Sequence, residues 1–96
     1  MNFASLKQEL DQLFTKIKNA STEGDQPELS DVKQFVRLCS QMQNYADEEW
    51  AFEADDFMHL ANELLQTVKN ENIQDMFPLI DSLEDSMNYC HRTFKA

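Results

Sequence analysis

Apolar residues recur at steps of three and four along most of the chain, which is the spacing that places side chains on one face of an α-helix. Charged and amide side chains occupy most of the positions between them. Four such stripes can be separated, and the most regular one runs from Ile73 to Phe94. The pattern therefore predicts four amphipathic helices, near residues 2–19, 30–47, 54–69 and 74–95.

The stretches between the stripes indicate where each helix ends. Residues 19–28 contain the only glycine and the first proline, which predicts a mobile connection. Ser30 is the predicted N-cap of the second helix, because its hydroxyl can accept a hydrogen bond from a free amide of the first turn. No Gly or Pro marks the turn before the third helix, so the position of this turn stays open, and a start of the helix as early as Trp50 is an alternative. Pro78 fits a fourth helix that starts near Asp75, whereas an earlier start predicts a kink.

Four amphipathic helices with short connections favour one arrangement, an all-α antiparallel up-down-up-down four-helix bundle. The 96 residues are enough for a single domain, which we place at residues 1–96. The apolar stripes should face inward and form one core. We expect this core to include Leu6, Leu10, Leu13, Ile17, Phe35, Cys39, Met42, Phe57, Leu64, Ile80, Leu83 and Met87.

The charge of the chain limits its partners. Eighteen acidic against eight basic side chains give a formal net charge of −10. This charge repels phosphate, so nucleic acid and anionic membranes are excluded as partners, and a protein with a basic surface is favoured. No apolar run approaches the length of a membrane span. The first residues lack the basic start and apolar stretch of a secretory signal, which predicts a cytoplasmic protein.

The two cysteines, Cys39 and Cys90, both fall on apolar stripes. Two cysteines do not make a disulfide framework, and a reducing compartment keeps thiols free. Burial among apolar side chains also raises the pKa of a thiol and shields it. We therefore expect two reduced and poorly reactive cysteines.

An acidic segment with two aromatic residues lies between the second and third predicted helices. Six acids fall between Asp47 and Asp56. In one interpretation, Trp50 and Phe52 cover the end of the core. In the other, they anchor a partner within an acidic rim, a composition typical of binding hot spots. The predicted partner-binding residues are Asp47, Glu48, Glu49, Trp50, Phe52 and Glu53.

A second group of titratable residues comprises Glu53, Asp56, His59 and Glu63. The carboxylate-x-x-His step from Asp56 to His59 is one half of the pattern found in di-iron bundles, which need two such steps on facing helices. The third apolar stripe places His59 toward solvent, so we predict no metal site. No nucleophile, general base and orienting group can be assembled either, and the chain is not expected to be an enzyme.

The remaining candidate chemistry is Cys90-His91, close to the end of the fourth predicted helix. With a cysteine in place of Met87, the segment would read Cys-x-x-Cys-His, the attachment motif of c-type haem. The alternative is structural. Cys90 is then a small core residue, and His91 is a half-buried imidazole favoured by the negative end of the helix.

The segment from Cys90 to Lys95 resembles the C-terminus of cytochromes c′ and b562, in which a histidine ligand near the end of the last helix precedes an aromatic and a basic residue. The whole chain is most similar to bacterial XXXCH-domain proteins, which carry this degenerate motif. The resemblance implies a four-helix bundle, with His91 as an axial haem ligand and Cys90 as the single thioether. Phe3 and Leu6 occupy the region where b562-type proteins carry a methionine ligand.

Two functions follow from these patterns. The first is a non-catalytic bundle without cofactor that binds another protein. The alternative is a haem-binding electron-transfer or gas-sensing protein that uses His91 and at most one thioether through Cys90. We favour the first, because apolar side chains are available to fill the space that a haem needs. These are Phe3, Leu6, Leu10, Phe57 and Phe94.

Overall fold

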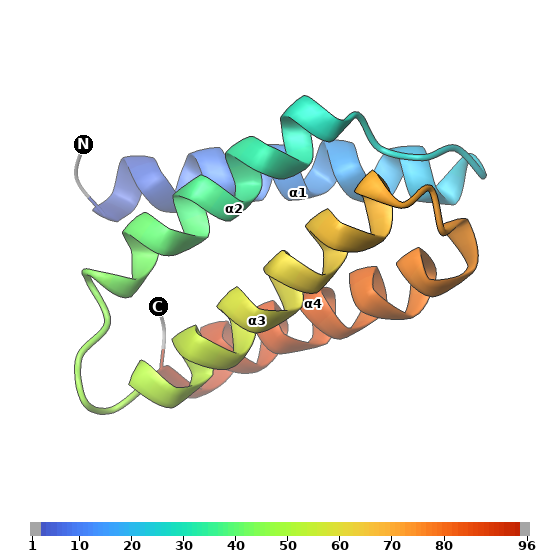
Figure 1. Cartoon of the computed structure of the whole chain (residues 1–96). Coiled ribbons are helices and arrows are strands. Elements are labelled where there is room, and N and C mark those ends of the chain that lie inside the picture. The colour runs from blue at the N-terminus through green and yellow to red at the C-terminus, as the bar shows by residue number, and fades with distance from the viewer. Residues whose placement is uncertain (1–2, 95–96) are drawn as a thin grey trace.

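The computed structural model describes residues 3–94, and their side chains as far as Cys90. It contains four helices, α1 (Phe3–Thr22), α2 (Leu29–Gln43), α3 (Ala51–Lys69) and α4 (Ile73–Phe94), and no strand within the described residues. Successive helices run in opposite directions, so the start of α1 and the end of α4 lie at the same end of the molecule (Figure 1). The prediction of an all-α antiparallel four-helix bundle is confirmed.

The helices pack mainly against their neighbours in the sequence. The helix α2 contacts α1 on one side and α3 on the other, and α4 packs on α3. Within the described residues, the backbones of α1 and α4 hardly approach each other. These two helices are joined by an ion pair between Lys18 and Glu84. The side of the bundle between α1 and α4 is therefore the least tightly closed.

The core contains apolar side chains from all four helices. Phe35 lies at its centre, with ring centroids 5.8 Å from Phe14 and 5.9 Å from Phe57. Most of the predicted core is confirmed, whereas three members are only partly buried, namely Leu13, Met42 and Met87. Phe14 is buried where Leu13 was expected. A helical turn of about 3.6 residues makes the inward stripe wide enough for either of two adjacent residues to face the core.

The connection from α1 to α2 is shorter than predicted. The helix α1 continues to Thr22 and ends in a Schellman turn, in which Gly24 has a φ of 79° and donates its N–H to the Ser21 carbonyl. Glu28, rather than Ser30, is the N-cap residue of α2. The connection is tied to the end of α3, because the Gln26 side-chain amide donates to the Val68 carbonyl at 2.9 Å.

The turn between α2 and α3 is longer than predicted. The helix α2 ends at Gln43 instead of residue 47, and α3 begins at Ala51 instead of residue 54. Within the connection, the Glu49 N–H donates to the Asp47 carboxylate at 3.0 Å. The helix itself ends without Gly or Pro in tighter hydrogen bonds over three residues, from the Asn44 N–H to the Gln41 carbonyl and from the Tyr45 N–H to the Met42 carbonyl.

The helix α4 begins at Ile73, one residue before the predicted range of 74–95 and two before the start near Asp75 that would suit Pro78. Pro78 therefore lies in the second turn and not in the first, and it removes one backbone hydrogen bond there. The preceding turn places Glu71 at a φ of 57°, a left-handed conformation that is uncommon for a residue with a side chain. The Glu71 and Asn72 N–H groups cap the end of α3 by donating to the Val68 and Thr67 carbonyls.

A substitution of Leu83 tests which face of α4 points into the core, because the Leu83 side chain is fully buried. We expect Leu83→Ala to lower the free energy of unfolding by about 2–5 kcal/mol, the usual cost of such a truncation. The matched control is Leu29→Ala, at a position that is 38% exposed, which should cost less than about 1 kcal/mol. Denaturant unfolding followed by circular dichroism measures both. Equal losses of unfolding free energy in the two variants would contradict the assignment of Leu83 to the core-facing side of α4.

Candidate functional site

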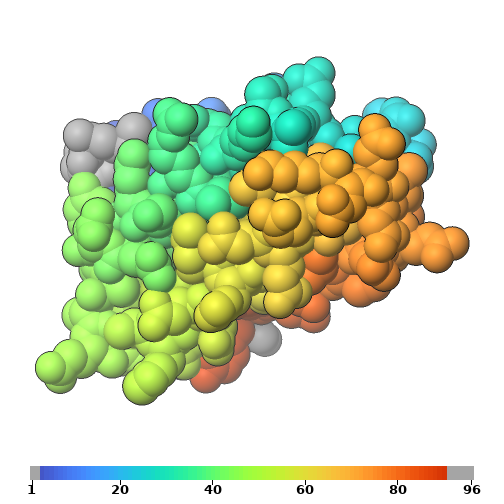
Figure 2. All heavy atoms as spheres, in the orientation of Figure 1, coloured from blue at the N-terminus to red at the C-terminus, as the bar shows by residue number. Residues whose placement is uncertain are grey.

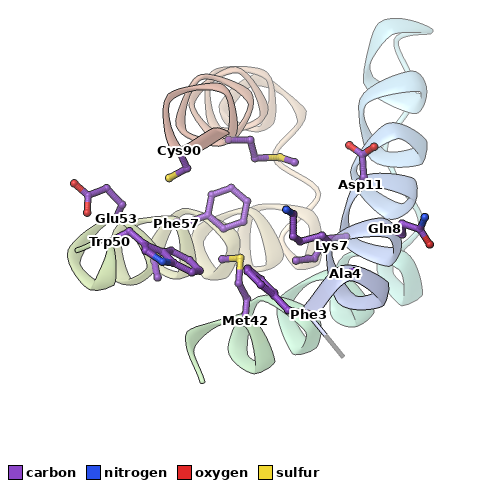
Figure 3. A pocket seen from close by; sticks show the side chains of 13 residues that line it. Phe3, Ala4, Lys7, Gln8, Asp11, Met42, Trp50, Glu53, Phe57 and Cys90 are labelled. Atoms are coloured by element: carbon purple, nitrogen blue, oxygen red, sulfur yellow. The ribbon is translucent and has the colours of Figure 1, made fainter. Parts of the chain in front are cut away.

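A pocket opens between α1 and α4 at the end of the bundle where α1 starts and α4 finishes. Its volume is about 390 Å³, and all four helices contribute to its wall (Figure 3). The lining is mainly apolar. It comprises Phe3, Ala4, Lys7, Gln8, Leu10, Asp11, Met42, Trp50, Glu53, Ala54, Phe57, Met87 and Cys90.

This pocket corrects one expectation from the sequence. Leu6, Leu10 and Phe57 are buried as expected, yet they leave a pocket of about 390 Å³ in the region they were predicted to fill. The reason is the separation of α1 from α4, which apolar spacing along a single helix does not reveal. The Phe94 side chain lies outside the described residues.

A stack of three aromatic rings lies beside the pocket, and two of them, Phe3 and Trp50, line it. The Phe3 ring stacks on both Tyr45 and Trp50, with ring centroids 5.2 Å and 5.8 Å away and nearly parallel planes. The stack joins the first residues of α1 to the α2–α3 connection. Trp50 is only 7% exposed as a result. It therefore covers the end of the core, and Phe52 is the more accessible of the two aromatic residues.

The charged side chains at the pocket point in different directions. The half-buried Lys7 extends its ammonium group into the pocket, toward Phe57, whereas the Asp11 and Glu53 carboxylates point away (Figure 3). The Lys7 Nζ lies 5.3 Å from the centroid of the Phe3 ring, a cation–π contact. Among the described side chains, no carboxylate forms an ion pair with Lys7.

The two cysteines differ in exposure, although both are free thiols. Cys39 is buried in the core, and desolvation raises the pKa of its thiol far above the usual range. Cys90 is only partly buried and lines the pocket, which corrects its expected place inside the core. Burial raises the pKa of the Cys90 thiol, and the negative charge of Glu53 raises it further.

The Cys90-His91 pair is only half described. The backbone of α4 remains helical to Phe94, so His91 lies on the last turns of the helix, but its side chain is outside the described residues. A cavity lies beside Cys90, the residue that the haem alternative uses for its thioether. It also has two thioethers, Met42 and Met87, in its lining. Sequence reasoning missed Met42 and Lys7 as pocket residues because both belong to helices far from Cys90 in the sequence.

A second candidate surface surrounds Phe52, and we call it the acidic edge. It comprises the exposed residues Asp47, Glu48, Glu49, Phe52, Asp55 and Asp56. Phe52 is 81% exposed. The segment forms a protruding corner, shown in light green at the lower left of Figure 2. No lysine or arginine occurs in the sequence between Arg37 and Lys69, so the local charge is strongly negative.

The structure separates the residues of the acidic segment into two groups. Asp47, Glu48, Glu49 and Phe52 belong to the acidic edge, whereas Trp50 and Glu53 lie outside it and line the pocket. Asp55 lies one turn beyond Phe52 on the same face of α3 and accepts a hydrogen bond from the Gln43 side chain at 2.7 Å. This bond ties the edge to the end of α2.

The histidine and carboxylates considered for metal binding do not form a cluster. His59 is exposed, as the helical pattern predicts, and Asp56 and Glu63 are exposed beside it on α3. Within the described part of the chain, no group of three or more His, Cys, Asp or Glu side chains is placed to hold a metal ion. None of the helices in that part combines the length and the hydropathy that crossing a bilayer requires.

Comparisons with family models, with curated proteins and with solved structures gave no match to this chain.

The cysteines provide a test of the pocket geometry. A thiol reagent should modify Cys90 faster than the buried Cys39 in the native protein, because access and thiolate content both control the rate. The Cys90 rate should increase as the pH rises, since its raised pKa leaves little thiolate near neutrality. Mass spectrometry of the labelled protein at several pH values measures both rates.

Glu53→Gln tests the effect of the Glu53 charge on the Cys90 pKa. Removing the negative charge should lower the Cys90 pKa and accelerate labelling at a fixed pH by roughly two- to fivefold, since such partly exposed charge interactions are worth less than about 1 kcal/mol. The control is Asp81→Gln, which removes an exposed acid on α4 outside the pocket and should leave the labelling rate of Cys90 unchanged. Faster labelling of Cys39 than of Cys90 would show that the pocket is placed incorrectly.

Proposed function

We propose that this protein is a non-catalytic cytoplasmic bundle that binds another protein through the acidic edge. The observation that carries the proposal is Phe52, which is 81% exposed within a rim of exposed carboxylates. Covering a large exposed aromatic side chain with a partner surface lowers the free energy, and aromatic residues are enriched at binding hot spots. The edge protrudes, so a partner surface can reach it without rearrangement of the bundle.

The charge of the edge defines the chemistry of the partner. Long-range attraction between the net charge of −10 and a basic surface accelerates encounter. The exposed carboxylates around Phe52 then contact the partner's basic groups at the rim of the interface. Rim charges of this kind act mainly on the association rate, whereas the buried aromatic residue sets the dissociation rate.

A photocrosslinking experiment tests the acidic edge and identifies the partner in one step. Phe52 is replaced by photoreactive p-benzoylphenylalanine, and the crosslinked proteins from a lysate are identified by mass spectrometry. We expect a basic protein to be captured at position 52 and lost as salt rises from about 0.05 to 0.5 M, because salt screens surface charge. The matched control is the same replacement of Phe77, which is 37% exposed and lies near the start of α4. The start of α4 is at the end of the bundle opposite the α2–α3 connection (Figure 1).

The captured protein then allows a direct measurement of affinity. Phe52→Ala should weaken its binding by about tenfold or more, because truncating a hot-spot residue costs more than about 1–2 kcal/mol. Phe77→Ala should leave the affinity unchanged. Equal crosslinking at both positions, or an affinity indifferent to Phe52→Ala and to salt, would remove the acidic edge as the binding surface.

The second candidate function is haem binding, and the pocket beside Cys90 is the observation that favours it. Its volume of about 390 Å³ is within the range of small-molecule sites. Met42 and Met87 line it, and thioether sulfur is an axial ligand of haem in cytochromes. The likeness of residues 90–95 to cytochromes c′ and b562, and of the chain to XXXCH-domain proteins, supports the same candidate. His91 would supply the first ligand and Cys90 one thioether.

We place haem binding second because the chain supplies one attachment thiol where c-type haem uses two. A pocket of about 390 Å³ is also near the lower end of the range for small-molecule sites, which disfavours a ligand as large and rigid as haem. We therefore expect titration with micromolar haem to give no stoichiometric change in absorption near the Soret band. His91→Ala is the matched variant for this titration. Stoichiometric binding by the native protein that disappears in His91→Ala would replace the protein-binding proposal with the electron-transfer or gas-sensing alternative.

A further inference from the structure

We infer that the pocket between α1 and α4 binds a small aliphatic carboxylate, with its hydrocarbon chain among the apolar side chains and its carboxylate on the Lys7 ammonium. The site differs from the acidic edge in position and in charge, and the inference goes beyond the proposed protein-binding function.

The lining of the pocket suits a flexible hydrocarbon chain. Leu10, Ala54 and Phe57 form buried apolar parts of its wall, and Met42 and Met87 add side chains that adapt to irregular shapes. A volume of about 390 Å³ lies near the lower end of the range for small-ligand sites. This size favours a single medium-length chain over a large rigid ligand.

Lys7 determines the charge of the ligand. Its ammonium group extends into the pocket, while the neighbouring carboxylates of Asp11 and Glu53 point away from it (Figure 3). No described carboxylate forms an ion pair with Lys7, and the ammonium instead contacts the ring of Phe3. A carboxylate on the ligand would form a charge-assisted hydrogen bond with this half-buried group.

The arrangement disfavours a cationic ligand. The face of Phe3 is already in contact with the Lys7 ammonium, and a second positive charge beside it would be repelled. The net charge of −10 does not prevent binding of an anion at this point, because salt screens exposed charges beyond about 8 Å at physiological ionic strength. The local charge at the pocket therefore decides which ligand is preferred.

Trp50 provides a built-in reporter, because it lines the pocket and is the only tryptophan in the sequence. The full chain is titrated with decanoate below its micelle concentration, and Trp50 fluorescence is recorded. Parallel titrations use decanol and decyltrimethylammonium, which carry no charge and a positive charge. We expect decanoate to bind several-fold more tightly than decanol, and decyltrimethylammonium to bind most weakly.

Chain length tests burial of the hydrocarbon. Affinity should fall roughly fourfold for each methylene removed between decanoate and hexanoate, the factor expected for one buried methylene group. Ala4→Phe places a larger side chain at an exposed position of the lining and should weaken every ligand.

Variants of Lys7 test the head group. Lys7→Gln should lower the affinity for decanoate by roughly three- to tenfold and leave the affinity for decanol unchanged. Lys7→Arg should retain the preference for decanoate over decanol. The matched control is Lys33→Gln, which removes one positive charge at an exposed position of α2 outside the pocket. It should leave the affinities for decanoate and for decanol unchanged.

Several results would overturn the inference. These are equal affinity of the native protein for decanoate and decanol, preference for the cationic ligand, or a decanoate affinity that Lys7→Gln and Lys33→Gln lower equally. The comparison of ligands on the native protein does not depend on the folding of any variant. Haem added to the decanoate complex provides a separate arm, because displacement of decanoate with development of a Soret band would assign the pocket to haem.

Discussion

The stacking of Phe3 on Tyr45 and Trp50 holds the first residues of α1 in place. It ties the start of α1 to the α2–α3 connection and not to α4. At the other end of α1, Lys18 pairs with Glu84 of α4. The helix is thus held to α4 in one region and to the α2–α3 connection in another. The space left between α1 and α4 near Cys90 is the pocket, so this space follows from side-chain contacts and not from a missing core.

The same stack also explains why the acidic edge is exposed. Trp50 directly precedes α3 and is held against Phe3, so the first turn of α3 has one orientation. Residues two positions apart on a helix point to opposite sides, because each residue turns the helix by about 100°. With Trp50 on the core side, Phe52 is directed away from the bundle and is 81% exposed. An exposed aromatic residue among carboxylates is therefore a consequence of local geometry.

The sequence was sufficient for the fold because each helix has its own apolar stripe, and period alone identifies the inward residues. The sequence was less informative about helix ends, about which of two adjacent residues is buried and about the pocket, because these depend on contacts between elements. The helix α2 ends at Gln43 without a Gly or Pro that would mark the end in the sequence, and Phe14 replaces Leu13 because the stripe is wider than one residue. The pocket could not be predicted, because it depends on the distance between α1 and α4. The separate environments of Trp50 and Phe52 likewise depend on contacts with Phe3, which lies far away in the sequence.

The two candidate sites share a boundary, and this limits how they can influence each other. Trp50 and Glu53 line the pocket, while Phe52 between them belongs to the acidic edge. A ligand in the pocket contacts the first turn of α3 from inside, and a partner contacts it from outside. Coupling between them requires a difference in ligand affinity between two arrangements of that turn. Since Trp50 stacks on Phe3 and Asp55 accepts a hydrogen bond from Gln43, the turn is held from two sides, and these contacts favour independent binding at the two sites.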